Sequence, residues 1–143
     1  MIATTISQSK HLLELGLDPK TADMCWVKDY TGQWVLITDT QINVRSRLEG
    51  MYEYSGFQWQ EHIALVPAWS LSALLEVMCY CHDVDVEFRK DKNLGWICKW
   101  TFYDFDNKKR LDLSKCGETK IEAAFEIMVT LFVQGLIKKG DND

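Results

Sequence analysis

Apolar residues recur at helical spacing in two stretches of the chain, and a third helix is indicated by a capping residue before it and by Gly16 at its end. The three expected helices cover residues 7–15, residues 70–80 and the segment between Thr119 and Gly135. The residues expected to cap them are Thr5 or Ser7, Ser70 and Thr119. In the last helix, Thr119 and Glu122 also form a T-x-x-E capping box.

Strict alternation of apolar and polar residues follows the second expected helix. In residues 84–90, Val84, Val86 and Phe88 point to one face and the charged residues to the other. A longer alternating segment spans residues 95–105, and residues 110–113 suggest a third strand. Short turns join the three, which predicts an antiparallel meander. Residues 24–38 predict a further pair of strands around a turn at Asp29–Gly32.

The remaining segment, residues 39–66, has no clean period, so we expect an irregular loop with a short strand or helical turn. Pro67 is expected to end this segment. Together the elements predict one α+β domain over residues 1–143, in which a small antiparallel sheet (a meander) packs against about three helices.

Composition narrows the classes of function. The net charge is −5 and the isoelectric point about 5.2, so bulk attraction to nucleic acid or to anionic lipid is not expected. The first residues lack the pattern of a signal peptide, and the apolar run "IMVTLFV" is too short to cross a bilayer. Five cysteines at irregular spacing suit reduced thiols. We therefore expect a cytoplasmic protein with no membrane partner.

The run "CYCHD" at residues 79–83 is the first candidate for chemistry. Cys79, Cys81 and His82 could supply three zinc ligands, with Cys98 or Asp83 as the fourth. The C-x-C spacing differs from the C-x2-C of common zinc sites, because residues two apart on a helix diverge by about 200°. The competing interpretation is a helix end with one buried cysteine and an exposed turn. No cofactor is expected.

Thiol or carboxylate catalysis is a second alternative centred on the same segment. Cys81 is followed directly by His82, although adjacent residues rarely adopt the geometry of a nucleophile and its base. Asp83, Asp85 and Glu87 fall on one strand face and could bind Mg²⁺ or Ca²⁺, with Asp104 and Asp106 expected on the partner strand. A row of carboxylates of this kind more often marks the solvent-exposed face of a sheet. The sequence therefore leans away from an enzyme.

A third alternative is weak nucleic-acid binding through the basic turn at Lys108, Lys109 and Arg110. Basic groups beside aromatic side chains can hold single strands, and Trp100, Phe102 and Tyr103 lie nearby in the sequence. Three basic residues at a turn usually serve only solubility, and the chain as a whole is acidic.

Six tryptophans are many for so small a core, so some are expected at a groove or an interface. An aromatic surface on the sheet, or on the loop before it, predicts binding to a protein partner or to a second copy of the chain. The candidate partner-binding residues are Trp96, Trp100, Phe102, Trp59 and Tyr54.

Two motifs carry a resemblance: "PAWSLSALLEVM" at residues 67–78 and "GETKIEAAFEIMVTLFVQGLIKK" at residues 117–139. With "LLELGLDPKTADM" at residues 12–24, they resemble a group of short uncharacterised proteins of gut-anaerobe bacterial genomes, often encoded in prophage or mobile-element regions. The resemblance implies a small protein of that type and carries no activity, cofactor or catalytic residue. The leading hypothesis is a non-enzymatic protein-interaction or self-associating module.

Overall fold

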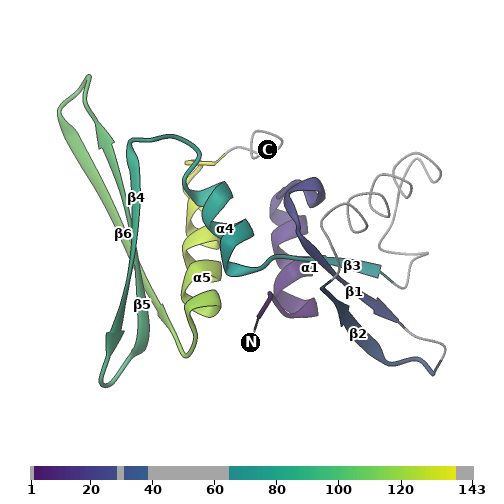
Figure 1. Ribbon diagram of the computed structural model, residues 1–143. Coiled ribbons are helices and arrows are strands. Elements are labelled where there is room, and N and C mark those ends of the chain that lie inside the picture. Colours follow the sequence, from purple (N-terminus) through teal and green to yellow (C-terminus); the bar gives the residue numbers. More distant parts are fainter. Residues whose placement is uncertain (1, 29–30, 39–64, 138–143) are drawn as a thin grey trace.

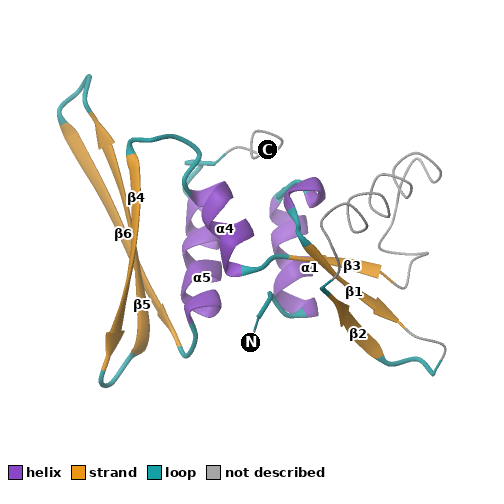
Figure 2. Ribbon diagram, in the orientation of Figure 1, coloured by secondary structure: helices purple, strands orange, loops and turns teal. Residues whose placement is uncertain are grey.

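The computed structural model describes residues 2–28, 31–38 and 65–137. Within this part of the chain, two antiparallel three-stranded sheets lie on either side of three helices (Figures 1 and 2). The helices are α1 (Ile6–Leu15), α4 (Leu71–Met78) and α5 (Lys120–Val133), with a short 3₁₀ turn at Pro19–Thr21. The strands are β1 (Met24–Lys28), β2 (Trp34–Ile37), β3 (Leu65–Ala68), β4 (Val84–Asp91), β5 (Gly95–Asp104) and β6 (Lys109–Gly117). The α+β fold class is confirmed.

The helix starts follow from the predicted capping residues. Thr5 accepts a hydrogen bond from the Gln8 amide at 3.1 Å, and the Gln8 side chain accepts from the Thr5 amide at 3.0 Å. Ser70 accepts from the Ala73 amide at 3.2 Å. These hydrogen bonds satisfy amides at the start of each helix that have no partner inside the helix.

At α5 the capping box differs slightly from the predicted one. The Thr119 hydroxyl accepts from the Glu122 amide at 3.1 Å, as expected. The Glu122 carboxylate accepts from the Glu118 amide at 2.9 Å, one residue before the helix cap. The carboxylate also lies near the positive end of the helix dipole, which favours its charge.

The sheet β2-β1-β3 contains a strand at the end of the segment for which the sequence predicted only a short strand or a helical turn. Residues 39–64 lie outside the described residues, but β3 begins at Leu65 and continues through Pro67, opposite Cys25 of β1. The prediction that Pro67 ends the preceding segment is therefore wrong. Proline is tolerated because β3 is an edge strand, where one side of the backbone needs no donor.

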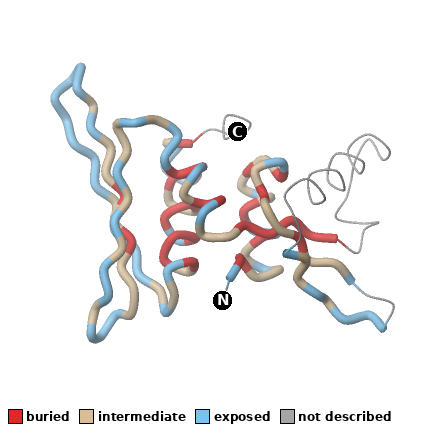
Figure 3. Tube along the Cα trace, in the orientation of Figure 1, coloured by how far each residue is buried: buried red, intermediate tan, exposed pale blue. Residues whose placement is uncertain are grey.

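The second sheet, β4-β5-β6, is the expected meander. Its third strand runs from Lys109 to Gly117, longer than the four residues predicted. The face of β5 that carries Cys98 and Trp100 packs toward α4 and α5, and both side chains are fully buried. The opposite face is covered by no described element, and Figure 3 shows how much of this sheet is exposed.

One hydrophobic cluster joins residues of all three helices and both sheets. Trp69, just before α4, is fully buried and its indole donates to the Thr21 hydroxyl at 2.9 Å. Its backbone pairs with the N-terminal segment: the Thr4 amide donates to the Trp69 carbonyl at 2.9 Å, and the Trp69 amide donates to the Thr4 hydroxyl at 3.0 Å. These contacts fix the N-terminal segment on the core. In the described part of the chain, no helix has the length and apolarity needed to span a membrane.

Candidate interaction surface on the β5–β6 hairpin

The structure does not bring the side chains of the segment "CYCHD" together into a cluster of candidate metal ligands. Cys79 caps the C-terminus of α4 and is exposed, while Cys98 is fully buried under the helices. The His82 side chain is 95% exposed, and its Nε2 lies 3.5 Å from the Asp83 carboxylate. Over the described ranges, no three His, Cys, Asp or Glu side chains gather closely enough to hold an ion.

The environment of two of the thiols does not favour nucleophilic chemistry. Burial raises the pKa of Cys98 to about 12, with a smaller contribution from nearby Cys79. Burial also raises the pKa of Cys79, and the neighbouring Asp85 and Cys81 add to the effect. Because the thiolate is the reactive species, both thiols are poor nucleophiles at neutral pH.

The predicted row of carboxylates exists on the uncovered face of the second sheet. Asp83, Asp85 and Glu87 line a shallow hollow of about 240 Å³. The hollow is also lined by cationic side chains, so its charge is mixed. These are Lys99 and Arg110, with Thr101 and Tyr103 between them.

The carboxylates expected on the partner strand serve local structure instead. Asp104 ends β5 and accepts from the Asn107 amide at 3.2 Å and from its side-chain amide at 2.7 Å, which stabilises the β5–β6 turn. These bonds lower the pKa of Asp104. Asp106 lies within the turn, so neither carboxylate joins the row on β4.

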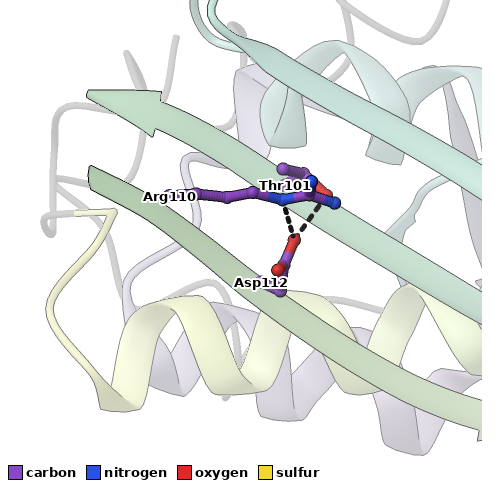
Figure 4. Close-up of polar contacts among 3 residues, drawn as sticks. All are labelled: Thr101, Arg110 and Asp112. Carbon is purple, nitrogen blue, oxygen red and sulfur yellow. Dashed lines mark hydrogen bonds and ion pairs between the residues drawn. The ribbon is translucent and has the colours of Figure 1, made fainter. Parts of the chain in front are cut away.

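On the same face, Asp112 of β6 is the acceptor for two neighbours (Figure 4). Arg110 Nε donates to Asp112 Oδ1 at 3.0 Å, and Thr101 Oγ1 donates to the same oxygen at 2.9 Å. These two hydrogen bonds, that of Arg110 first, lower the pKa of Asp112. The guanidinium of Arg110 is therefore already paired within the chain.

This pairing weakens the nucleic-acid alternative. Of the predicted basic turn, Arg110 is directed at Asp112, and Lys108 adopts a left-handed conformation with φ of 52°. Trp100 is fully buried, so its ring cannot stack on a base. Trp100 and Phe102 thus lie on the face of the sheet opposite to Arg110, whereas Tyr103 lies across from Arg110 on the same face.

The predicted partner-binding residues lie in different environments. The prediction that Trp100 contacts a partner is wrong, because Trp100 is a fully buried core residue. Its indole donates to the Met78 carbonyl at 3.0 Å. Phe102 is partly buried and stacks on Trp100, with 6.3 Å between ring centroids. Trp59 and Tyr54 lie outside the described residues.

Trp96 is the predicted partner-binding tryptophan that lines an open groove. The Lys120 ammonium lies 4.6 Å from the centroid of its ring, a cation–π contact. The groove has a volume of about 450 Å³ and lies where the segments leading into α4 and α5 approach the start of β5. Its apolar walls include Ile2, Leu71 and Ile121. The Lys90 ammonium also lies over this ring, 5.6 Å from its centroid.

Three exposed apolar residues at the far end of the second sheet were not predicted as a site. Phe105 is 66% exposed, Tyr103 44% and Leu111 37%. The rings of Tyr103 and Phe105 lie 5.0 Å apart. In Figure 1 the β5–β6 hairpin that carries them extends beyond the ends of α4 and α5. The sequence signal that could have identified this site is the aromatic residue between two aspartates in the turn segment "DFDNKK".

Comparison with protein families, with curated proteins and with solved structures gives no match for this chain.

Proposed function

We propose that the chain is a non-enzymatic protein-interaction module of the phage or mobile-element type, which binds a protein partner or a second copy of itself through the β5–β6 hairpin. The observation that carries the proposal is the pair of exposed rings of Tyr103 and Phe105, at the end of a sheet that no described helix covers there, with the exposed Leu111 on the opposite face of the same hairpin. The resemblance of the α4 and α5 motifs to short proteins of mobile elements supports the assignment to that type.

The hairpin has the composition expected of a binding surface. Interface centres are enriched in aromatic residues and surrounded by polar ones. Here Tyr103 and Phe105 form the aromatic centre, and Asp104, Asp106 and Lys108 surround it. Covering such rings removes apolar area from water at roughly 25 cal/mol per Å², which favours association. All five cysteines are free thiols, which suits a reducing compartment such as the cytoplasm.

The proposal is tested by affinity capture with two baits, the wild-type chain and the double variant Tyr103→Ser/Phe105→Ser, followed by mass spectrometry. Both substitutions are at exposed positions, so the variant should melt like the wild type. Proteins, or further copies of the chain, held by the wild type and lost from the variant would support the proposal. Identical captured sets on the two baits would refute it.

A further inference from the structure

Among the described residues, β6 is an outer strand of the second sheet, and no described strand pairs with its outer edge. The Tyr103 amide donates to the Asp83 carbonyl at 3.0 Å, which makes these two residues a hydrogen-bonded pair between β4 and β5. Because bonding direction alternates along each strand, Leu111 bonds toward β5. The backbone groups of Arg110 and Asp112 then point away from the sheet. Those groups form an open edge onto which another strand can add.

The side chains along this edge are complementary to a second copy of themselves. Arg110 and Asp112 lie on the uncovered face, and both are about half exposed. If two β6 strands pair antiparallel with Leu111 at the two-fold axis, Arg110 of each copy lies opposite Asp112 of the other. Opposite charges directly across a strand pair stabilise it.

Neighbouring registers are less favourable. An axis at Asp112 places this carboxylate against its own copy and Lys109 against Lys115 of the other copy. Like charges in that position destabilise the pairing. With the axis at Leu113, Arg110 and Asp112 each lie opposite a neutral residue of the other copy. Among these three registers, the axis at Leu111 alone forms two ion pairs between the copies.

The same register brings apolar side chains together on the face of the sheet that carries Leu111. The two Leu111 side chains meet at the axis as a non-hydrogen-bonded pair, whose Cα atoms lie about 4.5 Å apart in antiparallel sheets. Phe105 lies in the turn between β5 and β6, beyond Lys109, and is not part of the paired edge.

We infer that the partner of the hairpin is a second copy of the chain, joined through antiparallel β6 strands into one continuous six-stranded sheet. This inference rests on the proposed function, because it names the occupant of the same hairpin. It requires no other molecule and no rearrangement of the core.

A charge-swap experiment tests it directly. Arg110→Asp gives an edge with two carboxylates, and Asp112→Arg gives an edge with two guanidiniums. Each variant alone should self-associate at least about tenfold more weakly than the wild type, because like charges face each other twice. An equimolar mixture should form the heterodimer at near wild-type affinity, measured by native mass spectrometry. Because both variants lose the internal Arg110–Asp112 pair, recovery on mixing reports only the contact between copies.

Cross-linking tests the register. In a chain whose exposed or partly exposed cysteines are replaced by serine (Cys79, Cys81 and Cys116), Leu111→Cys should form a disulfide-linked dimer under mild oxidation. The matched control, Leu113→Cys, lies on the same face but away from the axis and should not. Cross-linking of the control alone, or of neither variant, would overturn the inference.

Failure of this inference can be distinguished from failure of the proposed function. A wild-type chain that stays monomeric throughout a dilution series overturns the second-copy assignment. If the same chain still captures another protein in a manner lost with Phe105→Ser, the hairpin remains a binding surface and only its occupant was misassigned. If neither association occurs, both proposals fail.

Discussion

The approach of the β4–β5 turn to the β6–α5 junction gives a sharp stability prediction. Gly95 is the first residue of β5, directly after this turn, and has φ of 80°. A Cβ atom added there would lie 2.6 Å from the Gly117 carbonyl oxygen and 3.3 Å from the Glu118 Cα. Both obstacles are backbone atoms, so no side chain can rotate away. Gly95→Ala should therefore suffer from its conformation and from crowding.

Gly32→Ala is the matched control, because Gly32 also has a positive φ, 87°, yet no described atom lies within 4 Å of an added Cβ. The left-handed conformation costs an alanine about 1–2 kcal/mol at both positions. Crowding adds about 1–3 kcal/mol at Gly95 alone. The expected losses of unfolding free energy are thus roughly 2–5 kcal/mol for Gly95→Ala and roughly 1–2 kcal/mol for Gly32→Ala.

Urea unfolding followed by circular dichroism measures both losses, and thermal melts should show about 2–4 °C per kcal/mol for a chain near this size. Equal destabilisation by the two substitutions would refute the reasoning, since it would mean that the turn does not press against the Gly117 carbonyl. Destabilisation of Gly32→Ala alone would do the same.

Three further predictions concern the core. Thr4→Val should lower the unfolding free energy by about 1–3 kcal/mol in urea unfolding, because the buried Trp69 amide loses its acceptor. Trp100→Phe should cost at least as much in thermal and urea melts, since the Met78 carbonyl loses a donor and a cavity remains. The raised pKa of Cys98, about 12 against an ordinary 9.0, means that the unfolded chain loses this proton first as pH rises. The associated stability should be intact below about pH 9 and should decline toward pH 12, and the decline should be smaller in Cys98→Ala.

Local signals in the sequence were sufficient to predict much of the fold. The three helices begin at Thr5, Ser70 and Thr119, because capping depends on residues within one turn of each other. The alternation along residues 84–105 likewise placed Cys98 and Trp100 on one face. Such patterns are carried by neighbouring residues and need no knowledge of the tertiary structure.

The errors arose where distant segments decide the outcome. The place of β3 was not predicted because its pairing with β1 joins segments about 40 residues apart, and Pro67 is acceptable only at a sheet edge. Alternation showed which residues share a face with Trp100 but not which face the helices cover. For the same reason, the exposed group around Phe105 could not be recognised until the hairpin was seen to extend beyond α4 and α5.

The most direct test of the central claim is native mass spectrometry of the reduced wild-type chain and of Tyr103→Ser/Phe105→Ser, each alone and each with the proteins that the wild type captures. The account predicts complexes of the wild type that the variant does not form, although the two melt at the same temperature. Complexes of equal abundance with both proteins would contradict the claim that the β5–β6 hairpin is the binding surface.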